Sequence, residues 1–255
     1  KESGLIWWVE NSESLFQIIS KFKEHRVNEE RIIKNDYCNN GYTMTSFQLY
    51  ELYQQVTKEN DSDEIDQYIW LMAPTSSIWL KKNINFVTSS ALMSIAGYLI
   101  GLGDRHPNNI LLQNTNGKIT HIDFEDSFET TMNRIKYPEK VPFRLTKMIV
   151  NALDGGTPFG LFKTTCEDVL SLLKEAKQTV LAQFHLFTLD STIMNNPKFN
   201  GKSIMKRIRE KLEGKDLFIL KEETPSAEIQ VEKLINVSSN PELYATQFVG
   251  WCPFW

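Results

Sequence analysis

Two short apolar runs separated by turn-forming residues predict a β-hairpin in the middle of this chain. The runs cover residues 109–113 and 118–123, and the sequence Asn-Thr-Asn-Gly lies between them. A four-residue connection that ends in glycine is typical of an antiparallel hairpin. Because a hairpin brings its two ends side by side, Asn109 and Asp123 are expected to face one another. Asp104 lies in a glycine-led loop just before Asn109 and should reach the same point.

Two aspartates and an asparagine at one point suit a site for magnesium and phosphate. Mg²⁺ prefers oxygen ligands, takes few of them from protein and leaves the rest to water and phosphate. In phosphoryl transfer one aspartate orients the attacking hydroxyl, while an asparagine and a second aspartate hold the metal ions. The spacing Asp-x4-Asn, followed after a hairpin by Asp-Phe, is the protein-kinase arrangement of these parts. His106 here follows Asp104 instead of preceding it, and a structural hairpin with incidental acidic residues is the competing interpretation.

Composition bounds the class of protein without fixing its chemistry. The 255 residues are 41% hydrophobic and 24% charged, which is ordinary for a soluble globular protein, and the net charge of −4 gives no indication of nucleic-acid binding. Three widely spaced cysteines offer neither a disulfide framework nor a zinc motif, and they fit a reducing compartment. Residues 1–10 lack a signal-peptide pattern, and the most apolar stretch, 91–102, is too short to cross a bilayer.

The residues around the hairpin resemble the catalytic and metal-binding loops of the phosphatidylinositol 3-kinase-related kinases. Gly-Asp-Arg-His-Pro-Asn-Asn occupies residues 103–109, and His-Ile-Asp-Phe-Glu-Asp occupies residues 121–126. Within that family, the chain resembles the target-of-rapamycin (TOR) kinases. The resemblance implies an α+β, mostly helical fold. This is the large C-terminal lobe of a protein-kinase-like fold with a short catalytic β-hairpin, followed by a helical FATC tail.

The same resemblance implies boundaries along the chain. Residues 1–10 would form the hinge between two kinase lobes, 11–222 the C-lobe, and 223–255 the FATC domain. Within the lobe, the implied segments are a catalytic loop at 101–109, a metal loop at 121–126 and an activation loop at 123–146.

The resemblance also implies a serine/threonine protein kinase that transfers the γ-phosphate of ATP to proteins in growth and nutrient signalling. Asp104 would orient the substrate hydroxyl and accept its proton, and His106 would support charge on the transferring phosphoryl group. Asn109 and Asp123 would bind Mg²⁺ or Mn²⁺ and, through the metal, ATP. His121 is expected to be mainly a structural strand residue.

The hinge and the activation loop supply further expected contacts. Trp8 and Val9 fall on the hinge and would lie against the adenine ring of ATP, with simple core packing of Trp8 as the alternative. Arg134, Lys136 and Lys140 in the activation loop could meet an anionic substrate, although such residues are more often solvated surface.

Two features depart from the kinase pattern. No Gly-x-Gly-x-x-Gly lid occurs and none precedes the hinge, so the chain is expected to be a large lobe plus tail with little activity by itself. Glu125 stands where the family has the glycine of Asp-Phe-Gly, and glycine permits φ values closed to glutamate. Two alternatives stay open: a phosphoinositide lipid kinase, which shares both motifs, and a pseudokinase scaffold.

The spacing of apolar residues predicts the remaining elements. Asn11 and Ser12 are expected to cap a helix through residues 15–22. A second helix is expected to bury Phe47, Tyr50 and Leu52. The full set of expected helices is 15–22, 45–57, 65–72, 76–80, 85–100, 142–153, 164–188 (with Leu170 and Phe187 in its core stripe), 203–212, 229–235 and 243–249.

Partners and location follow from the resemblance alone. TOR-like kinases dock a small Lst8-like β-propeller subunit on an insertion that corresponds to residues 25–57 here. Residues 25–42 match the family poorly, so a solvated helical hairpin is the alternative for this segment. The implied partners are a protein substrate and this subunit, with no nucleic acid. The implied location is the cytoplasm, with endomembrane surfaces and the nucleus as further options.

The ending Gly-Trp-Cys-Pro-Phe-Trp at residues 250–255 is similar to the FATC tail of TOR kinases. Trp251, Phe254 and Trp255 are too apolar to be scattered in water, so they either pack on the lobe or make a weak contact with a membrane interface. Packing is favoured, because the other charges of the tail are mostly acidic and anionic lipid would repel them. The cysteine partner of Cys252 in the family corresponds to Ala245, which argues against a redox switch in the tail.

Overall fold

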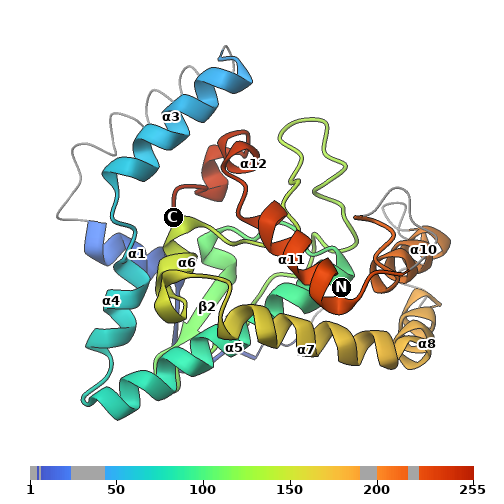
Figure 1. Ribbon diagram of the computed structural model, residues 1–255, viewed down its shortest axis with the longest axis horizontal. Coiled ribbons are helices and arrows are strands. Elements are labelled where there is room, and N and C mark those ends of the chain that lie inside the picture. Colours follow the sequence, from blue (N-terminus) through green and yellow to red (C-terminus); the bar gives the residue numbers. More distant parts are fainter. Residues whose placement is uncertain (1–4, 6, 24–43, 190–199, 218–223) are drawn as a thin grey trace.

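The predicted hairpin is present at the centre of a small antiparallel sheet. This computed structural model describes residues 5, 7–23, 44–189, 200–217 and 224–255. Helices surround the sheet (Figure 1). The elements are β1 (Ser12–Ser14), α1 (Leu15–Lys23), α3 (Ser46–Glu59), α4 (Glu64–Leu71), α5 (Ser76–Ile100), η1 (Pro107–Asn109), β2 (Ile110–Gln113), β3 (Ile119–His121), α6 (Lys147–Ala152), η2 (Asp154–Gly156), α7 (Leu161–Glu175), α8 (Lys177–Thr188), α10 (Gly201–Leu212), α11 (Ala227–Ser238), α12 (Pro241–Ala245) and η3 (Val249–Trp251).

The sheet has the order β1-β2-β3, and the edge strand β1 was not predicted. β2 and β3 pair antiparallel with Ile110 opposite His121, as the hairpin requires. β1 pairs with β2 on the other side, with Ser12 opposite Gln113. Ser12 therefore belongs to a strand, and the expected cap at residues 11–12 is wrong. Ser14 performs this role instead, because its hydroxyl accepts a hydrogen bond from the Gln17 amide at 3.2 Å.

The central helix α5 is continuous from Ser76 to Ile100, whereas the sequence suggested two helices at 76–80 and from 85. Lys82 and Asn83 between those segments are buried, and Lys82 holds the hairpin turn. Lys82 Nζ donates to the carbonyl oxygens of Met72 at 3.0 Å and Asn114 at 2.7 Å. Among the described residues α5 is also the helix long and apolar enough to span a membrane, but 56% of that window is buried inside the protein. Its apolar character is that of a core helix.

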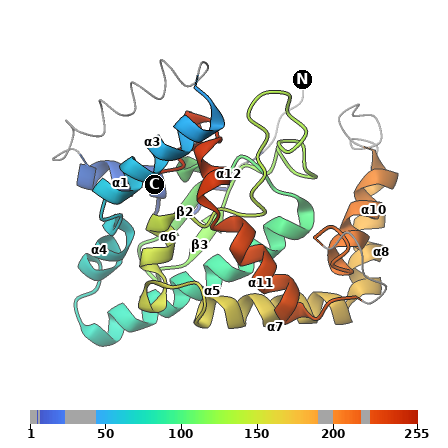
Figure 2. The same cartoon turned by 45° about the horizontal axis from the view of Figure 1, so that its top comes forward.

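The main core forms where α7 packs on α5 and α11 packs on α7 (Figure 2). Phe86 and Ile95 of α5 meet Phe162 and Leu170 of α7 there, and each is 1% exposed or less. Two of the predicted helices in this region have different bounds. The segment at 164–188 is divided at Ala176 into α7 and α8, and the segment at 142–153 is helical only from Lys147. Phe187 is 45% exposed, so its assignment to the core is also wrong.

Helix α10 holds the start of the activation loop through the half-buried carboxylate of Glu129. Arg207 donates two hydrogen bonds to Glu129, at 2.8 and 2.9 Å, and Lys211 Nζ lies 2.8 Å from the same side chain. Lys211 also donates to the Tyr98 carbonyl at 2.8 Å. Although burial alone would raise the pKa of Glu129, the hydrogen bonds from Arg207 and Lys211 lower it to about 2. The activation loop is thereby attached to α10 and to the end of α5.

The C-terminal tail packs on the lobe, in agreement with the favoured expectation. Trp251 is 3% exposed. The guanidinium carbon of Arg144 lies over its indole ring, 4.2 Å from the ring centroid. The ring of Trp255 lies 5.3 Å from Phe16, and the ring of Phe254 lies 5.8 Å from Tyr53. The expected helix at 243–249 is instead α12 followed by the short η3.

Helix α3 contacts this tail with a face that differs from the prediction. Tyr53 and Val56 are each 5% exposed, and Tyr53 stacks on Tyr244 of α12 with 6.3 Å between ring centroids. Phe47, which was expected to be buried, is 67% exposed. Residues 24–43, which contain most of the segment implied to dock a β-propeller, lie outside the described residues.

Leu170→Ala should weaken the contact between α5 and α7. Removing this side chain, which is 1% exposed, creates a cavity and should lower the free energy of opening by ~2–5 kcal/mol. Native-state hydrogen exchange of α5 peptides in the intact protein measures this quantity. Leu172→Ala on the 65% exposed face of the same helix is the matched control and should change it by less than about 0.5 kcal/mol. Equal effects of the two variants would contradict the assigned packing.

Glu129→Gln should destabilise the protein at pH 7 and much less in acid. The folded-state pKa of about 2 lies below the ordinary value of 4.5, so the stabilisation is complete above about pH 5 and is lost as the pH falls from 4.5 towards 2. The difference in Tm between wild type and variant should therefore narrow between pH 5 and pH 3.5. Glu228→Gln, an exposed acid on α11, is the control and should show no such trend. A Glu129→Gln effect independent of pH would contradict the ionic network.

Candidate active site

The catalytic loop begins where α5 ends in a left-handed glycine. Gly101 has φ +62° and directs the chain away from the helix axis. Gly103 donates its amide to the Asp126 carbonyl at 2.8 Å. A Cβ atom at Gly103 would lie 1.9 Å from the Thr131 hydroxyl oxygen, so no other residue fits this position without displacing the activation loop. The close approach of these two loops places Asp104 beside the activation loop.

Asp104 adopts a left-handed backbone conformation with φ +57°. Its amide donates to both carboxylate oxygens of Glu139, at 2.8 and 3.1 Å. Its carbonyl accepts a hydrogen bond from the Asn109 amide nitrogen at 3.0 Å. The Asp104 carboxylate lies 3.8 Å from His106 Nε2 and keeps about a third of its side-chain surface exposed (34%). The backbone of this aspartate is therefore held on both sides, while its carboxylate stays accessible to a substrate.

The imidazole of His106 is oriented by its own loop. Nδ1 accepts a hydrogen bond from the Asn108 amide at 3.2 Å, so in the neutral ring the proton is on Nε2. Burial lowers the pKa of His106, and the nearby Asp104 carboxylate opposes this shift only in part. A neutral His106 at pH 7 presents an N–H donor on the side of Asp104.

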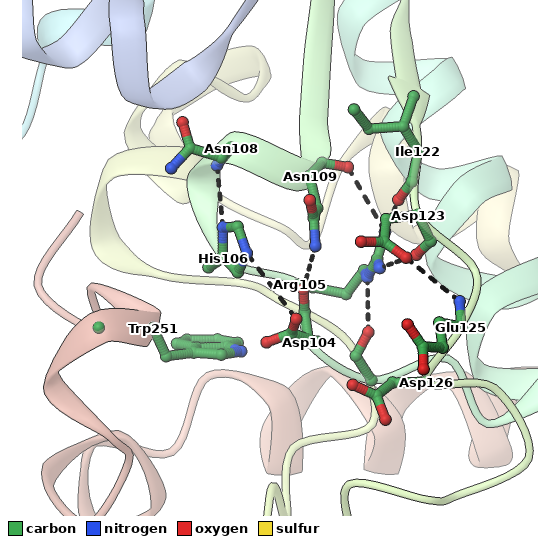
Figure 3. A network of polar contacts seen from close by, with 12 residues as sticks. Asp104, Arg105, His106, Asn108, Asn109, Ile122, Asp123, Glu125, Asp126 and Trp251 are labelled. Carbon is green, nitrogen blue, oxygen red and sulfur yellow. Dashed lines mark hydrogen bonds and ion pairs between the residues drawn. The ribbon is translucent and has the colours of Figure 1, made fainter. Parts of the chain in front are cut away.

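Asn109 and Asp123 meet at the open end of the hairpin, as the sequence indicated (Figure 3). The Asn109 carbonyl accepts from the Ile122 amide at 3.0 Å, which fixes the two loops relative to each other. Asp123 also has φ +57°, and its exposed carboxylate accepts from the Glu125 amide at 3.3 Å. Glu125 is not among the residues with positive φ, so this loop does not use the conformational freedom that a glycine would supply there.

Arg105 joins the catalytic and metal loops, a role that was not predicted from the sequence. Its side chain is buried (3% exposed) and donates to the carbonyls of Gly103 at 2.8 Å and Ile122 at 2.7 Å, and also to the Asp123 carbonyl. Burial lowers the pKa of Arg105, and the surrounding carboxylates of Asp104 and Asp123 partly restore it. The adjacency of an arginine to the key aspartate in the Asp-Arg-His motif was the available signal.

His121 is structural in this arrangement. Burial, and then the charge of Arg105, lower its pKa to about 3, so the ring is neutral at physiological pH. Its Nδ1 atom is buried and has no hydrogen-bond partner within the part of the chain that the structure describes. These properties agree with the expectation of a strand residue at the end of β3.

A cleft of about 310 Å³ lies over Asp104 and His106. Its other walls come from the activation loop, through Arg134 and Tyr137, and from the tail, through Trp251. The indole nitrogen edge of Trp251 is directed towards Asp104 (Figure 3). The remaining lining residues are Lys136, Glu139, Gln247, Phe248 and Gly250. The cleft therefore combines the predicted base with aromatic and cationic walls.

The donor set fits a hard divalent cation that carries most of its own ligands. Asn109 and Asp123 supply an amide oxygen and a carboxylate, and Asp104 supplies a second carboxylate nearby. Within the described residues there is no group of three or more His, Cys, Asp or Glu side chains that could hold a metal. A sparse set of oxygen donors suits Mg²⁺, which keeps several waters and binds together with phosphates.

The expected hinge residues precede β1, at the end of the sheet that carries the hairpin turn. Trp8 is 66% exposed, and the Val9 carbonyl accepts from the Ser12 hydroxyl at 2.6 Å. The Asn11 carbonyl accepts from the Asn114 amide at 2.8 Å, at the turn of the hairpin. Trp8 is not a core residue, so an indole surface is available at the start of the lobe.

Comparison with known proteins places these features in a family. Residues 1–196 match the family model described as phosphatidylinositol 3- and 4-kinase, and residues 225–255 match the FATC domain. The serine/threonine-protein kinase tor1 of Schizosaccharomyces pombe is 33% identical over 99% of this chain and 13% of its own length. The target of rapamycin homolog of Caenorhabditis elegans is 31% identical over 100% of this chain and 11% of its own length.

Solved structures agree with these sequence matches. A symmetric butterfly dimer of Tel1 kinase has a TM-score of 0.85 and 26% identity, covering 100% of this chain and 11% of that chain. The FAT and kinase domain of CtTel1 has a TM-score of 0.80 and 26% identity, covering 97% of this chain and 18% of that chain. The chain spans 11–13% of the length of the two curated relatives from Schizosaccharomyces pombe and Caenorhabditis elegans. It belongs to the phosphatidylinositol 3- and 4-kinase family, carries a FATC domain, and is similar over its whole length to target-of-rapamycin kinases.

Proposed function

We propose that this chain is the catalytic C-lobe and FATC tail of a TOR-type serine/threonine protein kinase, which transfers the γ-phosphate of ATP to a protein hydroxyl. The gathering of Asp104, Asn109 and Asp123 at one end of the hairpin carries this proposal. The relatives matched over the whole chain are named as serine/threonine-protein kinases or TOR homologues, which favours protein over lipid substrates. The presence of all three side chains argues against a pseudokinase scaffold.

Each side chain has a distinct role in the proposed reaction. The substrate hydroxyl donates a hydrogen bond to Asp104, which accepts the proton as the oxygen attacks the γ-phosphorus and the bond to the ADP oxygen breaks. His106 donates its Nε2–H to an oxygen of the transferring phosphoryl group. Asn109 and Asp123 would hold Mg²⁺ or Mn²⁺, which when bound would neutralise charge on the phosphates.

Nucleotide and partner contacts are also proposed outside the loops. The exposed indole of Trp8, together with Val9, is proposed to bind the adenine ring at the hinge. Helix α3 projects from the body of the lobe (Figure 1) and exposes Phe47, which suits the proposed Lst8-like β-propeller partner. The proposed location is cytoplasmic, including endomembrane surfaces and the nucleus. Because Trp251 is 3% exposed, the structure offers no support for membrane contact through that ring.

Asp104→Asn tests the catalytic role directly. The variant of the intact native protein should lose on the order of 10²–10³ in kcat because the proton acceptor is removed, while ATP affinity should change little. The measurement is phosphorylation of a protein substrate and of inositol lipid in parallel, with ATP binding followed separately. Asp154→Asn, an exposed acid on η2, is the control and should keep full activity. Wild-type activity in Asp104→Asn, or transfer to lipid alone, would overturn the proposal.

Asp123→Asn tests the metal role. Losing a carboxylate ligand should increase the Mg²⁺ concentration for half-maximal activity by about tenfold or more, because Mg²⁺ binds a neutral amide more weakly than a carboxylate. Activity is titrated with Mg²⁺ at saturating ATP, and Glu228→Gln is the control. An unchanged Mg²⁺ requirement would exclude Asp123 as a ligand.

A further inference from the structure

Glu139 is a buried acid from the activation loop whose carboxylate binds the catalytic loop. It is 6% exposed, and both of its oxygens accept the amide hydrogen of Asp104, at 2.8 and 3.1 Å. The two residues are 35 positions apart in the chain. Burial raises the pKa of Glu139, with the Asp104 amide acting in the opposite direction. Burial and the like charge of Asp104 both destabilise the Glu139 carboxylate, so its position beside Asp104 must have a structural reason.

The reason lies in the backbone of Asp104. A non-glycine residue at φ +57° is strained, although less so for aspartate than for most side chains, and contacts with neighbouring groups hold it in that conformation. Glu139 binds the Asp104 amide on one side, and Asn109 binds the Asp104 carbonyl on the other. An amide hydrogen bond to a charged carboxylate is stronger than one to a neutral carbonyl. Glu139 is thus the group that holds the N-terminal side of this strained residue.

Glu139 can hold Asp104 only while its own loop is folded. The Glu139 amide donates to the Thr131 carbonyl at 3.3 Å, which closes the activation loop on itself. Arg134 of the same loop lies 3.8 Å from a Glu139 oxygen and 2.6 Å from Asp126. The Asp126 carbonyl in turn accepts from Gly103, the residue before Asp104. Unfolding of this loop would therefore withdraw the carboxylate from Asp104.

We propose that Glu139 is a positioning residue that makes the conformation of Asp104 depend on the fold of the activation loop. This inference rests on the proposed function of Asp104 as the base in phosphoryl transfer. Glu139 also lines the cleft, but in this scheme it makes no direct contact with ATP or with the substrate hydroxyl. Its effect on catalysis passes entirely through the backbone of Asp104.

Two substitutions of Glu139 in the intact native protein separate this role from a general effect on folding. Glu139→Ala removes the acceptor and should lower kcat about 10- to 100-fold, because a small displacement of a catalytic group costs a factor of this size. Its Kd for ATP and its KM for a peptide substrate should stay within about threefold of wild type. Glu139→Gln keeps a carbonyl oxygen of similar reach and should restore kcat to within about threefold of wild type. Ile135→Ala, on the exposed tip of the same loop, is the control and should leave all values unchanged.

Hydrogen exchange of the peptide that contains residues 101–109 tests the contact independently of activity. Glu139→Ala should speed exchange of the Asp104 amide at least tenfold, and Glu139→Gln should protect it. If the proposed function is wrong, the wild type transfers no phosphate, but the exchange rate of the Asp104 amide still responds to Glu139→Ala. If the positioning role is wrong, this exchange rate does not respond. A wild-type kcat in Glu139→Ala would overturn the inference. The inference would also be overturned if Glu139→Ala lost ATP affinity and Tm in proportion to its loss of kcat. A Glu139→Gln variant as impaired as Glu139→Ala would overturn it too, as would an unchanged exchange rate of the Asp104 amide in Glu139→Ala.

Discussion

The geometry of the site depends on the hydrogen bonds that the Arg105 guanidinium donates to backbone carbonyls. Asp104 and Asp123 both occupy left-handed backbone conformations, and each belongs to a loop without regular hydrogen bonding. Arg105 is buried between these loops and binds carbonyl oxygens from both, including those of Gly103 and Ile122. Carbonyl oxygens at such turns are costly to leave without a donor in the protein interior. One side chain therefore satisfies the backbone of two loops and fixes the distance between the carboxylates that they carry.

A second buried arginine extends this connection to the C-terminal tail. Arg144 donates to the Arg105 carbonyl at 3.2 Å and to the carbonyls of Trp251 at 2.8 Å and Cys252 at 2.6 Å. Burial lowers the pKa of Arg144 to about 10, which still leaves it charged at neutral pH. The FATC tail is therefore linked to the catalytic loop through two arginines in series, and its indole at Trp251 forms a wall of the cleft. The tail belongs physically to the site, although it is the most distant segment in the sequence.

Local chemistry predicted the hairpin and the convergence of Asp104, Asn109 and Asp123, because turn formers and strand pairing act over a few residues. Long-range contacts explain the errors. Lys82 and Asn83 appeared to interrupt α5, but both are buried because distant carbonyls accept their hydrogen bonds, that of Asn114 in the hairpin turn for Lys82 and that of Ala152 for Asn83. Phe47 was assigned to a buried face, whereas α3 turns Tyr53 towards the tail, a contact that periodicity cannot reveal. The roles of Arg105 and Glu139 were missed because both bind backbone groups: for Arg105 the only signal was its place beside Asp104, and the spacing of Glu139 gave none.

Helix α5 also determines how the hairpin can move. At about 1.5 Å per residue its 25 residues form a rod of about 38 Å. Lys82 near its start holds the hairpin turn, Ser89 accepts the Ile119 amide at 2.8 Å along its length, and Gly101 at its end leads into the catalytic loop. Sliding of the hairpin along this rod would break these bonds together. The hairpin and α5 therefore form one rigid unit, so any opening at the site must come from segments outside this unit.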